Sequence, residues 1–125
     1  MGILSMLLGC LKTNKNINII NAETAYELMQ TEEVIVLDVR TTDEFNSGHI
    51  ENAINLDVSY IKDEIPDILP DKNAKILIYC RSGNRSYQAA LKLDKLGYTN
   101  IYDFGGINSW PYEIIKWLKY DISLF

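Results

Sequence analysis

Cys80 is the residue of this sequence whose surroundings best suit chemistry. It ends a short apolar, β-branched run, residues 76–80, and a polar loop follows before a helical pattern begins. A strand, a tight loop and a helix start in this order hold a thiol against a ring of backbone N–H groups. Those groups and the positive end of the helix dipole favour negative charge. The pattern therefore predicts a reactive thiolate that meets an anionic substrate.

The loop after Cys80 supplies the other candidate binding groups. Arg81 and Arg85 carry planar guanidinium groups that suit oxyanions. Gly83 permits a backbone angle that a β-carbon would resist. Since the backbone amides of the loop can also face an anion, we take all six residues as candidate substrate-binding groups: Arg81, Ser82, Gly83, Asn84, Arg85 and Ser86.

The composition limits the classes of partner. The chain has 125 residues, with 17 Asp plus Glu against 12 Lys plus Arg, which gives a net charge of −5. This balance argues against nucleic acid or an anionic membrane as a general partner. The length predicts one folded domain.

Cysteine and histidine are too few for a metal site. Cys10 and Cys80 lie far apart, without zinc-ligand spacing, and His49 is the single histidine. We therefore expect no metal, no cofactor and no disulfide framework. A reducing, cytoplasmic setting follows as the simplest expectation.

The N-terminal end differs in character from the rest. Residues 1–10 are mostly apolar, but this run is too short to span a bilayer. We expect residues 1–16 to form a short helix or a mobile tail, which leaves contact with a partner or a membrane surface open. Residues 17–125 are expected to form the functional domain, as a monomer.

Strand and helix patterns alternate along this domain. Strands are predicted at 17–20, 34–39, 53–56, 75–80 and 101–104, and helices at 22–29, 42–48 and 86–96, with broken helix over 59–69. A last helix is predicted with Pro111 in its first turn, carrying Ile114, Ile115, Trp117 and Leu118. The alternation indicates an α/β fold with a mostly parallel five-stranded sheet and helices on both faces.

Polar residues follow the carboxyl ends of three of these strands, where parallel sheets form their sites. Besides Cys80, they include Asp38 and Arg40 after one strand and Gly105-Gly106 after another. We expect Asp38 and Arg40 to form an ion pair that shapes the wall of the site, with direct substrate contact as the alternative. Glu44 is expected to pair with Arg40 or to face solvent, and His49 to make a structural hydrogen bond.

Four motifs in order resemble the single-domain rhodaneses, a family of sulfurtransferases. They extend from about Ile17 to about Trp117. The motifs are Leu37-Asp38-Val39-Arg40 with Asp43-Glu44-Phe45; Gly48-His49-Ile50 with Ala53-Ile54-Asn55; Tyr79 to Ser86; and Leu96-Gly97-Tyr98 with Gly105-Gly106. The resemblance implies a five-stranded, mostly parallel sheet wrapped by helices, in agreement with the strand and helix patterns.

The resemblance also implies an enzymatic mechanism. Cys80 would take the outer sulfur of thiosulfate or a related small anionic donor and carry it as a persulfide. Cyanide, a small thiol or a protein thiol would then accept the sulfur. This is covalent catalysis in two steps, and loop amides can stabilise its anions without a histidine base.

Other functions are compatible with the same residues. The chain could be a persulfide carrier or protein-binding module with little thiosulfate turnover, or a regulatory relative, which the presence of Cys80 disfavours. A cysteine phosphatase or arsenate reductase is a further alternative. Phosphatase loops have a Cys-x5-Arg spacing, whereas Cys80 and Arg85 are spaced Cys-x4-Arg. The smaller ring suits a sulfane sulfur better than a tetrahedral phosphate.

Overall fold

A five-stranded parallel sheet forms the centre of the protein in the computed structural model, which describes residues 14–116. Its strand order is β1-β6-β5-β2-β4, and every neighbouring pair is parallel. The strands are β1 Ile17–Ile19, β2 Ile35–Asp38, β4 Ile54–Asn55, β5 Ile76–Cys80 and β6 Ile101–Gly106. The α/β class and the five predicted strands are confirmed.

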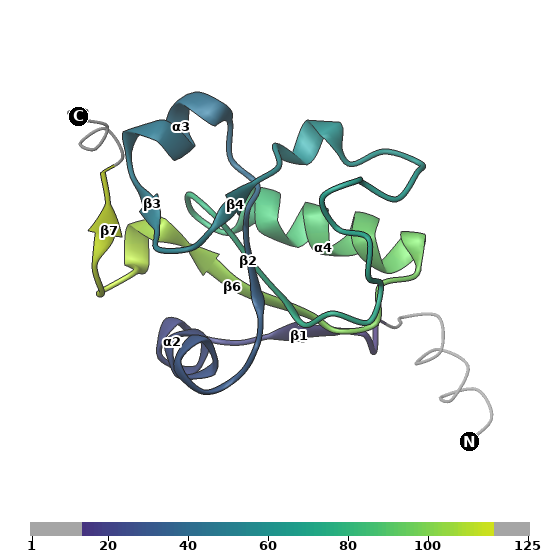
Figure 1. Ribbon diagram of the computed structural model, residues 1–125, viewed down its shortest axis with the longest axis horizontal. Coiled ribbons are helices and arrows are strands. Elements are labelled where there is room, and N and C mark those ends of the chain that lie inside the picture. The colour runs from purple at the N-terminus through teal and green to yellow at the C-terminus, as the bar shows by residue number, and fades with distance from the viewer. Residues whose placement is uncertain (1–13, 117–125) are drawn as a thin grey trace, which may run out of the picture.

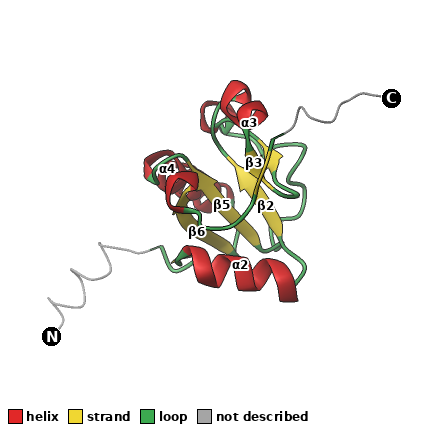
Figure 2. Cartoon of the chain, turned by 90° about the vertical axis from the view of Figure 1, so that its left-hand side faces the viewer, coloured by secondary structure: helices red, strands yellow, loops and turns green. Residues whose placement is uncertain are grey.

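Helices cover both faces of this sheet. Helix α2, Ala22–Thr31, packs on one face and helix α4, Asn84–Leu96, on the other (Figure 1). The short helix α3, Thr42–Ser47, lies beyond the end of β2 (Figure 2). Single 3₁₀ turns occupy Val58–Tyr60 and Ile107–Ser109. No helix within residues 14–116 is long and apolar enough to cross a membrane.

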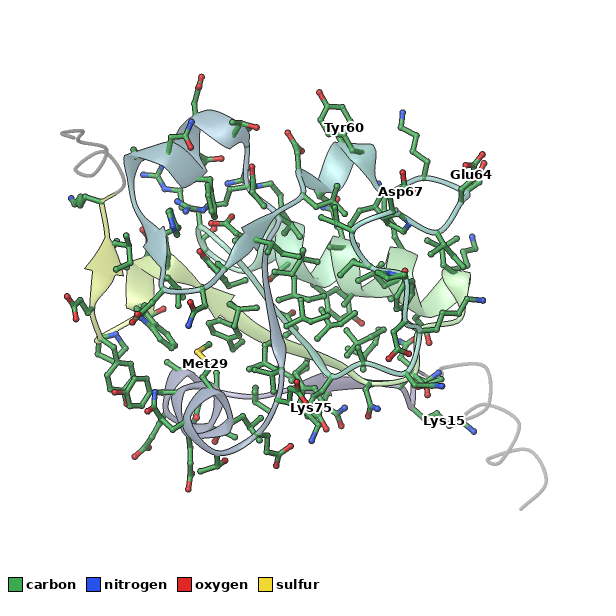
Figure 3. The ribbon with its side chains drawn as sticks, in the orientation of Figure 1. Lys15, Met29, Tyr60, Glu64, Asp67 and Lys75 are labelled. Atoms are coloured by element: carbon green, nitrogen blue, oxygen red, sulfur yellow. The ribbon has the colours of Figure 1, made fainter. Side chains whose placement is uncertain are left out.

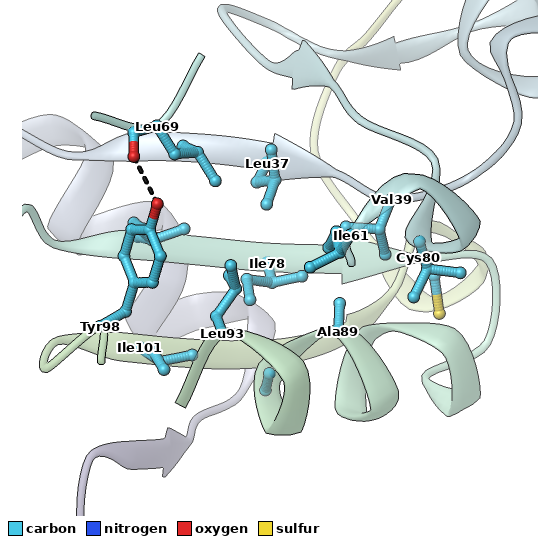
Figure 4. Packing of buried hydrophobic residues seen from close by; sticks show 13 residues of the cluster. Leu37, Val39, Ile61, Leu69, Ile78, Cys80, Ala89, Leu93, Tyr98 and Ile101 are labelled. Carbon is cyan, nitrogen blue, oxygen red and sulfur yellow. Dashed lines mark hydrogen bonds between the residues drawn. The ribbon is translucent and has the colours of Figure 1, made fainter. Parts of the chain in front are cut away.

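The two faces of the sheet bury separate apolar clusters because successive strand residues point to opposite sides. Every residue of β5 is buried, as expected for a central parallel strand. Cys80 belongs to the cluster under α4, where it lies beside Ala89 at the end away from Tyr98 (Figure 4). The α2 face holds Tyr79, and Met29 extends from α2 into this layer (Figure 3).

The predicted last helix is wrong in the part that the structure describes. Strand β7, Ile114–Ile115, forms there instead and pairs antiparallel with β3, His49–Ile50. Two β-branched residues favour an extended backbone once a partner strand is available. Trp110, which precedes this segment, is buried against Phe104. Trp117 and Leu118 lie outside the described residues, as do Cys10 and residues 1–13.

The segment 59–69 also differs from its prediction. Apart from the turn Val58–Tyr60, it is irregular, and Pro66 lies within it. Its two buried side chains, Ile61 and Leu69, attach the segment to the α4-side core. Tyr60, Glu64 and Asp67 point outward from the same segment (Figure 3). Burial of these two apolar side chains therefore holds the segment in place, although the segment does not form a helix.

Candidate active site

Cys80 lies at the carboxyl end of β5 with only 1% of its surface exposed. Its Sγ accepts a hydrogen bond of 3.0 Å from the backbone N–H of Gly83. One side of the thiol therefore meets apolar side chains and another meets a polar backbone donor. Such a donor stabilises a sulfur anion more than a neutral thiol.

The loop turns at Gly83, whose φ of 110° places it in the left-handed region. A residue with a β-carbon would be strained there, so glycine suits the turn that brings this N–H to the sulfur. Gly106 permits the loop to lie close to β6. A β-carbon at Gly106 would come 2.1 Å from the carbonyl oxygen of Arg81, which accepts a hydrogen bond from the N–H of Asn108.

Helix α4 begins without a side-chain cap because its N-cap residue is Gly83. By contrast, Asn21 caps α2, and Thr41 caps α3 with Glu44 completing a capping box. The N–H groups of an uncapped first turn are available to an anion, and the helix dipole adds to their attraction. The start of α4 therefore suits an anionic ligand beside Cys80.

Ser86 and Asp103 lie behind the loop, and both are buried. The hydroxyl of Ser86 is 2.7 Å from Oδ1 of Asp103 and 3.0 Å from the carbonyl oxygen of Gly83. The N–H of Gly105 donates to the same Oδ1 at 3.0 Å. Burial raises the pKa of Asp103, and the two hydrogen bonds oppose that rise.

Arg85 pairs with Glu44 of α3. The prediction that Glu44 pairs with Arg40 or faces solvent was therefore wrong. Two guanidinium nitrogens of Arg85 donate to the two carboxylate oxygens of Glu44 at 2.8 and 3.0 Å. The hydrogen bonds from Arg85 lower the pKa of Glu44 to about 2, and the pairing raises the pKa of Arg85. Arg40 is unavailable to Glu44 because it is buried against Asp38.

Asp38 and Arg40 form the expected ion pair, with Nη2 and Oδ2 2.6 Å apart. Arg40 also donates to the carbonyl oxygen of Gly48 at 2.7 Å and lies over the ring of Tyr79. Burial lowers the pKa of Arg40, but the hydrogen bonds and charge of Asp38 raise it further, so the net shift is upward. Asp38 lies beside Tyr79 in the sheet register, on the face opposite the Cys80 side chain.

His49 is buried and its Nδ1 lies 2.9 Å from the carbonyl oxygen of Phe45, whose ring stacks on the imidazole. Since a carbonyl only accepts, Nδ1 carries the proton in this contact. The hydrogen bond agrees with the structural contact expected for His49.

The remaining loop residues lie at the rim. Arg81, Ser82 and Asn84 are exposed, whereas Gly83 and Arg85 are half-buried. Sequence reasoning missed Asp103 among the residues around the loop. A charged residue two positions before Gly105-Gly106, in an otherwise apolar strand, was the signal that could have identified it. Residues 14–116 contain no cluster of three His, Cys, Asp or Glu side chains placed to hold a metal ion.

Comparison with known proteins gives one consistent family. The chain matches the Rhodanese-like domain over residues 21–112. It is 35% identical to the thiosulfate sulfurtransferase PspE of Escherichia coli over 71 residues, which are 57% of this chain and 68% of that protein. It is 38% identical to a sulfurtransferase of Allochromatium vinosum, covering 75% of this chain and 88% of that one.

A solved structure agrees with these relatives. The rhodanese-related protein of Thermoplasma volcanium superposes with a TM-score of 0.68 at 32% identity, covering 79% of this chain and 98% of that chain. Family match, sequence identity and fold agree with the four motifs around Asp38, His49, Cys80 and Gly105. The chain therefore belongs to the rhodanese-like domain family.

Proposed function

We propose that this protein is a thiosulfate sulfurtransferase-like enzyme. It moves a sulfane sulfur from thiosulfate or a related small anion to a thiol or protein thiol, through a persulfide on Cys80. The observation that carries this proposal is the Cys80 sulfur at the end of β5, bonded to the Gly83 N–H beside the uncapped start of α4. The named sulfurtransferase activity of relatives that match most of the domain supports the same reaction.

In the first step the Cys80 thiolate attacks the outer sulfur of thiosulfate. A new S–S bond forms to Cys80, the bond between the two donor sulfurs breaks, and sulfite leaves with the electron pair. In the second step an acceptor thiolate attacks the outer sulfur of the persulfide. The Cys80 thiolate is released, and the acceptor carries the sulfur as its own persulfide.

The loop residues have distinct roles in this mechanism. The Gly83 N–H stabilises the thiolate before attack and the leaving thiolate of the second step. Arg81 is exposed at the rim, and three N–H groups of Arg85 stay free of Glu44, so both can bind donor oxygens. Ser82 and Asn84 supply further rim donors. Because Cys80 is only 1% exposed, the narrow approach suits a single protruding sulfur.

The proposed roles of Asp38 and Arg40 are indirect. Their ion pair holds the Gly48 carbonyl, and therefore the end of α3, in place. Helix α3 carries Glu44, which orients Arg85 of the loop. The pair thus shapes the site through α3 rather than by touching the donor.

Intact mass spectrometry tests the covalent step. After incubation with thiosulfate, the native protein should gain one sulfur, about 32 Da. A Cys10→Ser variant should gain the same mass, and a Cys80→Ala variant should not. No mass gain on the native protein would contradict the mechanism.

The same assays separate the alternatives. Sulfur loading from a desulfurase-type protein without thiosulfate turnover would favour a persulfide carrier. Hydrolysis of p-nitrophenyl phosphate faster than thiosulfate turnover would favour a phosphatase. We further propose that the enzyme works as a monomer. We also propose that it works in the reducing cytoplasm, since the mechanism needs Cys80 as a free thiol.

A further inference from the structure

Asp103 is a buried carboxylate whose polar contacts are all with the segments around Cys80. It is 5% exposed, and among residues 14–116 it forms no ion pair with a lysine, arginine or histidine. Burying an unpaired carboxylate is unfavourable unless hydrogen bonds compensate. Its hydrogen-bond donors are the Ser86 hydroxyl and the Gly105 N–H. A residue chosen for packing alone would be apolar at this position of β6.

These contacts continue to the reactive sulfur. The Ser86 hydroxyl lies 2.7 Å from Asp103 Oδ1 and 3.0 Å from the Gly83 carbonyl oxygen. The N–H of the same Gly83 donates to Cys80 Sγ at 3.0 Å. The Ser86 hydroxyl therefore shares its single proton between the Asp103 carboxylate and the Gly83 carbonyl, while the Gly83 N–H reaches the sulfur.

We propose that Asp103 is a positioning residue that acts through Ser86 to hold the Gly83 N–H on the Cys80 sulfur. Gly83 is the flexible point of this connection, because glycine has the widest choice of backbone angles. Asp103 Oδ1 accepts hydrogen bonds from both the Ser86 hydroxyl and the Gly105 N–H. It therefore links the first turn of α4 to the Gly105 turn of β6, and Gly83 lies against Gly105, where a β-carbon would come 3.7 Å from the Gly105 Cα. Without this link the Gly83 turn gains freedom, and its N–H spends less time on the sulfur. The inference rests on the proposed function only in treating Cys80 as the reacting thiol.

The test measures how fast iodoacetamide alkylates Cys80 as a function of pH, in the full chain with Cys10→Ser. Asp103→Leu removes the acceptor at similar volume, and Ser86→Ala removes the connecting hydroxyl. Ser86→Ala should move the midpoint of the pH profile upward by about one pH unit, since one charge-assisted hydrogen bond to sulfur is weakened. Asp103→Leu also removes a negative charge, so its midpoint should be about one unit above that of Asp103→Asn, which has the same charge. Sulfur loading from thiosulfate should slow about tenfold.

Two further variants distinguish positioning from general destabilisation. Asp103→Asn keeps an acceptor oxygen and should not raise the midpoint. Tyr98→Phe removes a buried hydroxyl that donates to the Leu69 carbonyl. This contact belongs to the apolar cluster that contains Cys80, at the end of the cluster away from that residue (Figure 4). It should reduce stability and leave the midpoint unchanged.

The double variant Ser86→Ala/Asp103→Leu should move the midpoint no further than the larger single change, since both act on one N–H. Additive shifts, or equal midpoints in folded Asp103→Leu and Asp103→Asn, would overturn the proposal. If Asp103→Leu does not fold, a native midpoint in Ser86→Ala overturns it equally. Alkylation needs no sulfur donor, so the role of Asp103 can be tested even in a protein that fails to turn over thiosulfate.

Discussion

Two buried aspartates flank the central strand and are satisfied in opposite ways. Asp38 on β2 meets the guanidinium of Arg40, whereas Asp103 on β6 meets only the neutral donors Ser86 and Gly105 N–H. An ion pair cancels the charge that burial penalises, but two neutral donors cancel it incompletely. The difference indicates that the Asp38–Arg40 ion pair stabilises the fold. Asp103 instead holds the loop in place and lowers the stability of the folded protein.

The largest expected effect comes from breaking the ion pair. Arg40→Met leaves Asp38 buried without a cation and should lower the free energy of unfolding by about 3–5 kcal/mol. Urea denaturation followed by circular dichroism measures this change. The double variant Asp38→Asn/Arg40→Met removes both charges and should recover much of the loss. An Arg40→Met variant as stable as the native protein would show that Arg40 does not compensate the buried charge of Asp38.

A smaller effect, of opposite sign, is expected at Asp103. A carboxyl group whose pKa is raised by folding binds its proton more readily in the folded state, so its ionised form opposes folding above its usual value of 3.8. Asp103→Asn should therefore raise the melting temperature at about pH 7, and the gain should fade as the pH falls toward 3.8. Asp38→Asn should instead lower the melting temperature at neutral pH, because it removes the anion from Arg40. A change of melting temperature in the same direction for both variants would contradict this difference between Asp38 and Asp103.

The smallest effect is expected at Glu44, which belongs to α3 and pairs with Arg85 of the loop. Its pKa falls from 4.5 to about 2 in the folded protein, so its contribution is complete above 4.5 and disappears as the pH falls through about 2. Glu44→Gln should lower the free energy of unfolding at neutral pH by about 1 kcal/mol or less, since the pair with Arg85 is partly exposed. The difference between Glu44→Gln and the native protein should vanish near pH 2.

Glu32→Gln is the matched control for Glu44→Gln. It removes an ion pair with Lys75, which precedes β5 at the end of the strand away from Cys80. Glu44→Gln releases Arg85 of the loop and should also slow thiosulfate turnover, whereas turnover should stay native in Glu32→Gln. A loss of turnover there equal to that in Glu44→Gln would show that Glu44 has no special relation to the loop.

Local patterns were enough to predict the centre of the fold and the place of the thiol. Apolar β-branched runs predicted the five strands, because buried parallel strands need such residues on both faces. The order of strand, loop and helix around Cys80 predicted a sulfur beside a helix start. These features depend on residues within one turn or one strand of each other. The prediction failed at Ile114–Ile115, since that strand exists only by pairing with His49–Ile50.

Sequence alone thus determined the α/β class, the family motifs and the position of Cys80 at the end of β5. Tertiary structure decided which charges meet: Glu44 with Arg85, 41 residues apart, and Asp103 with Ser86, 17 apart. Such pairs depend on how α3, α4 and β6 are placed around β5, and no local spacing encodes that placement. The physical reason is that periodicity reports which face a residue is on, whereas charge partners depend on which elements share that face.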